Sequence, residues 1–131
     1  MIDLERFNRS PYYQLLGMRA SAEVQGRARV ELPFDEKLTQ LYGGVHGGAL
    51  MTLADAAISI AVTTLLPEGE RVVTTEVSVQ FLEPAGRDGI IAEGEVLRRG
   101  KRLAFGRCEI RAGSRLVACA QGICALLTVR P

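Results

Sequence analysis

The sequence predicts an α+β fold in which a curled antiparallel sheet wraps around one long central helix. Three observations lead to this prediction. A long apolar run follows a glycine-rich turn at residues 43–48 and continues to Pro67. Four strand-like segments separated by well-marked turns follow the run, and a hairpin precedes it. Because an apolar helix must be covered on most sides, a sheet formed by these strands is the element available to cover it.

The N-terminal part is predicted to form a broken helix and a hairpin. Residues 4–15 mix apolar and charged positions around Pro11, which is typical of a short, interrupted amphipathic helix. Residues 18–23 and 27–32 flank a short turn, and the second segment alternates apolar residues with Arg and Glu. That period of two is typical of a half-exposed strand. Residues 33–44 then form an irregular approach to the long helix.

The helix is expected to begin at Gly47 or Gly48 and to end at Leu66, before Pro67. Its polar residues fall within one stripe about 80° wide at 100° per residue: Thr52, Asp55, Ser59 and Thr63. Asp55 is the only charged side chain in the run. A buried carboxylate without a partner is so unfavourable that it shifts its pKa, finds hydrogen-bond donors or lies in a cavity where it does chemistry.

Strands are predicted after the helix at residues 72–82, 89–99, 103–112 and 115–127. A Pro- and Gly-containing loop and two tight hairpins separate them. Antiparallel segments in such quick succession form one sheet, which twists and curls as it covers the helix.

Composition restricts the class of protein. The 131 residues fit a single domain, residues 1–131. With 16 basic and 15 acidic residues the net charge is +1, which argues against a nucleic-acid groove or a polybasic membrane patch. The central Asp55 and the strand-rich remainder argue against a membrane span. Charges among the first six residues interrupt the apolar core that a secretion signal needs, so we expect a cytoplasmic protein.

The three cysteines have no C-x-x-C spacing and predict neither a disulfide framework nor a zinc site. If residues 113–114 form a two-residue hairpin turn, Cys108 lies directly opposite Cys119 as a hydrogen-bonded pair. The Cα atoms of such pairs are about 5.5 Å apart, which suits a disulfide poorly. Reduced thiols are therefore expected.

Two motifs at the start of the long helix, VHGGAL at 45–50 and LADAA at 53–57, resemble the signature of the hotdog-fold thioesterases. Within that family the chain looks most like the PaaI-like acyl-CoA thioesterases of the phenylacetate-degradation type. The segments VSVQFLEP at 77–84 and GKRLAF at 100–105 extend the resemblance over nearly the whole chain.

This resemblance implies a fold, an assembly and a reaction. In the family the sheet wraps the helix, two subunits join their sheets into one, dimers often pair into tetramers, and the active sites lie at the dimer interface. The implied reaction is hydrolysis of an acyl- or aryl-acyl-CoA thioester to the free acid and coenzyme A. No metal or organic cofactor is implied, because coenzyme A is part of the substrate.

The glycine-rich helix start suits this chemistry. A thioester carbonyl under attack develops negative charge on its oxygen, and backbone N–H groups at a helix start are placed to receive it. Gly47 and Gly48 offer such groups and let an acyl chain approach closely. The resemblance makes Gly47 the oxyanion donor. The alternative is that the glycines only permit a tight turn.

Asp55 lies nine residues after His46, where this branch places its catalytic carboxylate, acting on substrate held by the opposing subunit. It would be a general base that activates water or a nucleophile that forms a mixed anhydride. The alternative is an Asp hydrogen-bonded to Thr52, Ser59 or a partner strand.

Three further positions are candidates through the resemblance. Gln40 occupies a position where relatives commonly carry an Asn that orients the attacking water or the thioester, and its longer side chain would donate the same hydrogen bonds from about one methylene further away. Thr74 matches a position where a hydroxyl helps to place the attacking water. His46, the sole histidine, is expected to order the turn and contact substrate rather than to transfer the proton. The alternatives are a surface amide for Gln40 and a β-forming residue for Thr74.

A basic hairpin is a candidate site for the phosphates of coenzyme A, since relatives use the matching hairpin and Arg suits phosphate geometry. Its cationic residues are Arg98, Arg99, Lys101 and Arg102. A solvated hairpin tip is the alternative.

Two other functions compete with the thioesterase. A hotdog dehydratase or hydratase pairs a catalytic His with an acid in a different local motif, which the single histidine here fits poorly. A non-catalytic module that binds or senses acyl-CoA would keep the pocket without needing Asp55. Such sensors typically carry a DNA-binding segment, and the N-terminus shows no basic helix-turn-helix pattern.

Overall fold

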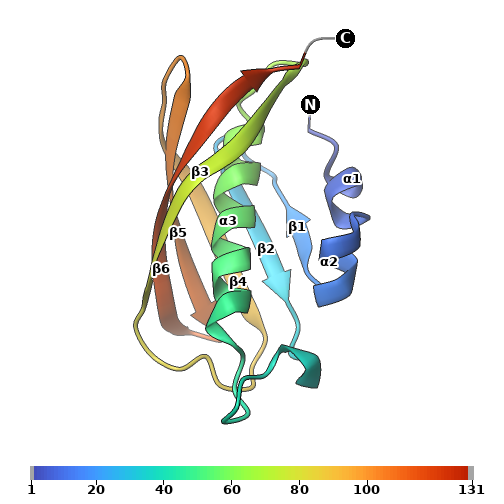
Figure 1. Ribbon diagram of the computed structural model, residues 1–131, viewed down its shortest axis with the longest axis vertical. Helices are drawn as coiled ribbons and strands as arrows, with labels where there is room; N and C mark the ends of the chain where they lie inside the picture. The colour runs from blue at the N-terminus through green and yellow to red at the C-terminus, as the bar shows by residue number, and fades with distance from the viewer. Residues whose placement is uncertain (1, 130–131) are drawn as a thin grey trace.

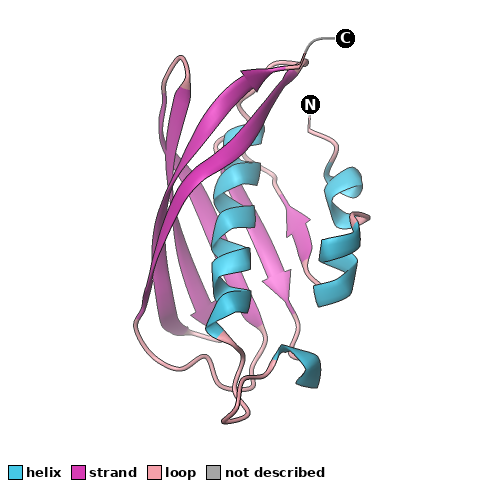
Figure 2. Ribbon diagram, viewed as in Figure 1, coloured by secondary structure: helices cyan, strands magenta, loops and turns pink. Residues whose placement is uncertain are grey.

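The fold is a six-stranded antiparallel sheet that curves around one long helix, α3 (Figures 1 and 2). The computed structural model describes residues 2–129. The strand order is β1-β2-β4-β5-β6-β3, so β1 and β3 form the two edges. The bounds are β1 Arg19–Ser21, β2 Arg27–Leu32, β3 Glu70–Phe81, β4 Ile90–Arg99, β5 Leu103–Ala112, β6 Arg115–Thr128 and α3 Gly47–Thr63. The predicted α+β class with a sheet curled around a central helix is confirmed.

The core lies between α3 and the concave face of the sheet. Leu53, Ala54 and Ala57 of the helix are fully buried, as are Val30 and Ile110 of the sheet. At Gly94 of β4 an added Cβ atom would lie 2.5 Å from the Ala57 carbonyl oxygen. The helix backbone therefore packs directly on the strand, and only glycine permits this approach.

Helix α3 begins at Gly47, as predicted, but ends at Thr63 rather than Leu66. Leu65 N–H donates to the Val62 carbonyl at 3.0 Å and Leu66 N–H to that of Thr63 at 3.1 Å, so the last turn tightens to bonds between residues three apart. The Thr64 hydroxyl donates to Ala61 and accepts from Gly26 N–H, which ties the helix end to the hairpin. Within residues 2–129, no helix is long and apolar enough to cross a membrane.

The N-terminal segment forms two short helices, α1 Leu4–Asn8 and α2 Pro11–Leu16, in agreement with the predicted interruption. They lie beside β1 in Figure 1. The buried Asn8 side chain joins them to β1, because it accepts from Ala20 N–H at 2.7 Å and donates to the Ala20 carbonyl at 3.1 Å. The Asn8 amide thus makes the two hydrogen bonds that a neighbouring strand would otherwise make with Ala20 at this short edge of the sheet.

The expected pairing of Cys108 with Cys119 is wrong. Ala112 pairs with Arg115 across the turn as assumed, but the register shifts between Ile110 and Arg111. Beyond this β-bulge Cys108 faces Ala120, and Cys119 faces Glu109. An extra residue in one strand cannot be detected by counting from the turn. The three cysteines are free thiols.

Candidate active site

The start of α3 presents a free backbone donor at Gly47. His46 is the N-cap, and its Nδ1 accepts a hydrogen bond from Gly48 N–H at 2.8 Å. The Ala49 N–H is bound to the His46 carbonyl. Within the described chain the Gly47 N–H meets no acceptor. The structure therefore leaves the Gly47 amide open to a ligand, whereas the Gly48 amide, predicted as a second contact, is used by the cap.

Both glycines are closely packed. A Cβ atom on Gly47 would lie 3.2 Å from the Phe81 ring at the end of β3, and one on Gly48 would lie 3.1 Å from His46 Nδ1. The His46 ring is exposed but its Nδ1 is an acceptor, which fits a residue that orders the turn.

Backbone hydrogen bonds hold the loop before the helix. His46 N–H donates to the Leu38 carbonyl and Val45 N–H to the Gly86 carbonyl, both at 2.8 Å. Gln40 N–H donates to the Gly44 carbonyl at 2.8 Å. The Gln40 side-chain oxygen accepts from Tyr42 N–H, so it closes its own turn, while its Nε2 has no partner among the described residues.

Arg87 fastens this loop to the rest of the molecule. Its Nη1 donates to the Gly43 carbonyl at 2.8 Å, its Nη2 binds Glu36, and its guanidinium lies 4.6 Å from the centre of the Phe34 ring. No sequence pattern predicted a role for this residue. Its partners Gly43 and Glu36 lie 44 and 51 positions away, so no local motif identifies it.

Asp55 lies two turns into the helix and is held by one side chain. Thr74 of β3 donates its hydroxyl proton to Asp55 Oδ1 at 2.6 Å. The neighbouring hydroxyls of the stripe bind the helix itself, since Thr52 donates to the Gly48 carbonyl and Ser59 to that of Ala56. The sequence raised the question of what stabilises the Asp55 charge. Thr74 and solvent do so, because the carboxylate is exposed in this single chain.

A cleft of about 720 Å³ opens beside Asp55. The helices α1 and α2 form one wall of this cleft, β3 forms the other, and α3 forms its floor. The lining residues are Phe7, Tyr12, Tyr13, Met18, Met51, Thr52, Asp55, Ala56, Ser59, Thr74, Thr75, Glu76 and Val77. Burial raises the pKa of Tyr13 to about 12, and the charge of Asp55 acts in the same direction. The cleft therefore holds a carboxylate beside a phenol that stays protonated.

The basic hairpin lies at the other end of the molecule. In Figure 1 the turn between β4 and β5 stands at the top, while α3 starts at the bottom. The 17 residues of α3 span about 25 Å between these ends. Arg99 pairs with Glu70 at 3.2 Å, whereas Arg98, Lys101 and Arg102 have no carboxylate partner among the described residues. One chain does not bring the hairpin and Gly47 together.

Residues with metal-ligand chemistry do not gather in the described part of the chain, where no three of His, Cys, Asp and Glu lie close together.

Comparison with known proteins identifies the family of this chain. The family model of the thioesterase superfamily matches residues 42–119. Human acyl-coenzyme A thioesterase 13 is 31% identical over 97 residues, which cover 71% of this chain and 68% of that protein. Matches to three archaeal relatives cover 65–70% of those proteins.

Solved structures show the same fold. A thioesterase from Haemophilus influenzae superposes with a TM-score of 0.91 at 21% identity, covering 100% of this chain and 94% of that one. A thioesterase family protein from Silicibacter pomeroyi has a TM-score of 0.88 at 30% identity, covering 95% and 94%. The chain therefore belongs to the thioesterase superfamily, a family of thioester hydrolases with the hotdog fold.

Proposed function

We propose that the protein is an acyl-CoA thioesterase of the PaaI-like type, which hydrolyses acyl- or aryl-acyl-CoA to the free acid and coenzyme A. The observation that supports this most is the Asp55 carboxylate. One of its oxygens is bound by Thr74, and the side chain is open to a cleft of about 720 Å³. The relative named acyl-coenzyme A thioesterase 13 supports the choice of substrate class.

The residues suggest a division of roles. Because the single hydroxyl proton of Thr74 is given to Oδ1, the other oxygen of Asp55 is left for the reaction. As a base it would take a proton from water while the water oxygen bonds to the acyl carbon. As a nucleophile it would bond to that carbon itself, and water would hydrolyse the anhydride. In both routes the free Gly47 N–H stabilises the oxyanion, and the C–S bond then breaks to release the coenzyme A thiolate.

The distance along α3 supports a site that is shared by two chains. Asp55 follows Gly47 by eight residues, or about 12 Å at 1.5 Å per residue. One chain is thus unable to bring both groups to one carbonyl carbon. We propose a dimer in which Gly47 of one subunit faces Asp55 of the other, with dimers pairing into tetramers.

The free edge of the sheet fits such a dimer. The 12-residue strand β3 pairs on one side with β6, and no strand of the described chain covers its other side. An open edge of this length readily pairs with another chain. Antiparallel pairing of two β3 strands would reverse the second subunit. Its basic hairpin would then lie at the end where the first subunit's α3 begins, within reach of the coenzyme A phosphates.

Mixed oligomers test this arrangement. Asp55→Asn removes the base, and Gly47→Pro removes the amide proton at the first helical position, where the backbone tolerates proline and the new ring would displace the exposed Phe81 side chain. The preceding His46 already has the extended ψ of 139° that a following proline requires. Each variant alone should release almost no thiol from a panel of acyl-CoA esters. Unfolded together and refolded, the two should regain about one quarter of the parental rate, because half of all pairs are mixed and each has one intact site.

Mixed samples that are no more active than the separate variants would refute the shared site. Parental protein that binds acyl-CoA without releasing thiol would instead support a non-catalytic binding protein.

A further inference from the structure

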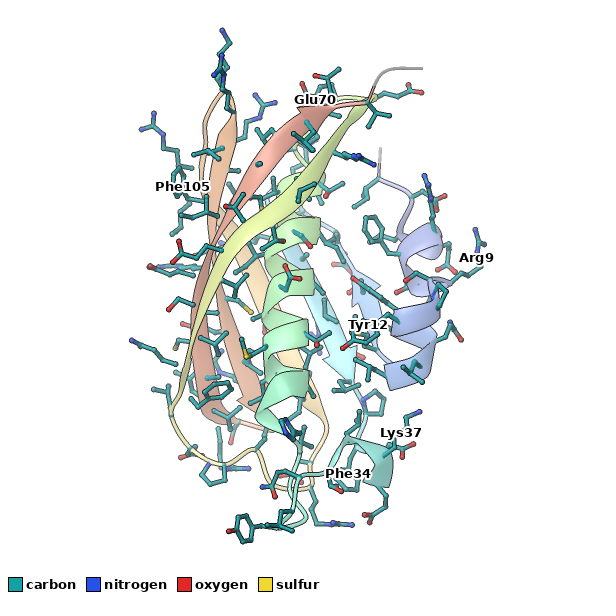
Figure 3. The ribbon with its side chains drawn as sticks, in the orientation of Figure 1. Arg9, Tyr12, Phe34, Lys37, Glu70 and Phe105 are labelled. Atoms are coloured by element: carbon teal, nitrogen blue, oxygen red, sulfur yellow. The ribbon has the colours of Figure 1, made fainter. Side chains whose placement is uncertain are left out.

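The wall of the Asp55 cleft that is formed by the N-terminal helices is aromatic and carries two adjacent phenols. Phe7 comes from α1, and Tyr12 and Tyr13 come from α2. Tyr12 projects from α2 toward α3 (Figure 3), where its hydroxyl lies 3.2 Å from that of Thr52. The two tyrosines share one helix and one cleft, but their hydroxyl groups have different surroundings.

Most hydroxyl protons in the cleft are already donated to the protein. Thr52 gives its single proton to the Gly48 carbonyl at 3.1 Å, so in the contact between Thr52 and Tyr12 the tyrosine is the donor. Thr74 donates to Asp55, and Ser59 donates to the Ala56 carbonyl. None of these groups has a proton left for a ligand.

Tyr13 differs from them. Its ring is partly buried in the cleft, and its hydroxyl has no hydrogen-bond partner among the described residues. Burial and the nearby Asp55 charge raise its pKa to about 12, so the phenol is a donor at neutral pH. A donor that is covered by an apolar ligand loses its water without replacement, which weakens binding of that ligand.

We propose that Tyr13 is a specificity-determining residue whose hydroxyl donates a hydrogen bond to an oxygen atom of the acyl group, beyond the thioester carbonyl. The site would therefore favour acyl groups that carry a hydroxyl, ether or further carbonyl oxygen over apolar acyl groups of the same shape. The identity of the ligand as an acyl-CoA rests on the proposed function; the unpaired donor does not.

Matched ligand pairs and matched variants test this inference. The ligands are non-hydrolysable thioether analogues of acyl-CoA in pairs that differ by one hydroxyl, at the third carbon of a four-carbon chain and at the far ring carbon of a benzoyl group. Affinities are measured by calorimetry for the parent, Tyr13→Phe and Tyr12→Phe. Removing an unpaired hydroxyl should leave the fold intact, which circular dichroism verifies.

For at least one pair the parent should bind the hydroxylated member about 3- to 10-fold more tightly, as expected for one hydrogen bond. Tyr13→Phe should abolish this preference by weakening only the hydroxylated member. Tyr12→Phe should affect both members alike, because its hydroxyl is bound to Thr52. A parent without preference in either pair, or a preference that survives in Tyr13→Phe, would overturn the inference.

The readout separates this inference from the proposed function. A protein that binds the analogues with the expected preference but releases no thiol from the matching thioesters would refute the thioesterase and keep the role of Tyr13. Thiol release with no effect of Tyr13→Phe on selectivity would do the opposite. If none of the analogues binds, the role of Tyr13 in acyl recognition is refuted.

Discussion

The two ends of the proposed site are built very differently within one chain. At the start of α3, the His46 cap, the backbone bonds of Val45 and His46 and the Arg87 side chain fix the position of the Gly47 amide. Two turns later, Asp55 is held by Thr74 alone and faces an open cleft. In the proposed dimer each subunit thus preassembles the amide that would stabilise the oxyanion, whereas the Asp55 carboxylate would meet its counterpart only when the second chain is present.

The largest expected effect comes from the open half. Asp55→Asn keeps the shape and removes the basicity, so thiol release should fall about 1,000-fold, within the range that general bases contribute. Ser59→Ala is the matched control, since its hydroxyl lies on the same stripe but binds only its own helix. The oligomer, measured by gel filtration, should remain. Parental turnover in Asp55→Asn would refute the role of this carboxylate.

The single bond that holds Asp55 comes next. Thr74→Val removes the donor with little change in volume, and the carboxylate then loses the one side chain that binds it within residues 2–129. We expect kcat to fall about 10- to 100-fold, as is common when the partner that orients a reactive group is removed. Thr74→Ser keeps the hydroxyl and should restore most of the rate. Equal rates in the Val and Ser variants would contradict this account.

A substitution of Arg87 tests how much the fixed position of the loop before His46 matters. Arg87→Ala removes the contacts with Gly43, Glu36 and the Phe34 ring, so the loop before His46 gains freedom. The expected result is a roughly 10-fold lower kcat with a smaller change in KM, because the amide contacts the oxyanion more strongly than the ground state.

Two variants of the same contact set serve as controls. Glu36→Gln removes only an exposed ion pair and should change the rate by less than about twofold. Arg87→Lys keeps the charge without the planar fork and should be intermediate. If Glu36→Gln lowers kcat as much as Arg87→Ala, the contacts of Arg87 with Gly43 and Phe34 are not what holds the loop.

The basic hairpin tests whether the two halves meet across subunits. Lys101→Ser with Arg102→Ser should raise KM for acyl-CoA several-fold and leave kcat nearly unchanged, because exposed cations contribute binding rather than chemistry. The parental KM should rise with salt concentration, and the variant should respond less. Equal salt dependence in both proteins would place the phosphates elsewhere.

The smallest expected effect is on the pH dependence of stability and concerns Cys108 in the buried core. Burial raises the pKa of Cys108 from 9.0 to about 12, and Cys119 adds to the shift. Between these pH values the unfolded chain has lost the proton that the folded chain retains, so the free energy of unfolding should decrease as the pH rises. Urea unfolding from pH 8.5 to 11 should show a shallower decrease for Cys108→Ala than for the parent. Tyr13 also has a raised pKa, so some slope remains. Equal slopes would contradict the shift.

The sequence was sufficient for the elements and not for the contacts between them. The start of α3 and the strand β5 lie where the pattern predicts them, because a glycine-rich cap and regular turns are local signals. The end of α3 and the partners of Cys108 differ, because a tightened turn and a β-bulge depend on neighbouring strands. The support that Arg87 gives to the loop was missed for the same reason.

The positions of Gln40 and Gly48 show a related limit. Gln40 was predicted to be a site residue from the resemblance and Gly48 from its place at the helix start, and the structure shows that Gln40 Oε1 and the Gly48 N–H are engaged within the turn. Such competition between a ligand and the chain's own caps is decided by side-chain geometry, which a motif does not contain.

Strand β3 contains two adjacent threonines that have the same side chain and different tasks. The register of β3 on β6 shifts between Thr74 and Glu76, which makes Thr75 an extra residue. Val77 and Val79, further along the strand, pack against the core. If side chains alternated strictly between the two faces of the sheet, Thr75 would point to the same inner face as these valines. With the shift, Thr74 faces Asp55 instead, while the Thr75 hydroxyl donates to the Ile123 carbonyl at 3.0 Å and secures the irregular ladder. The register of the backbone, rather than the type of side chain, thus decides which threonine supports the carboxylate. Two chemically identical neighbours are therefore not interchangeable.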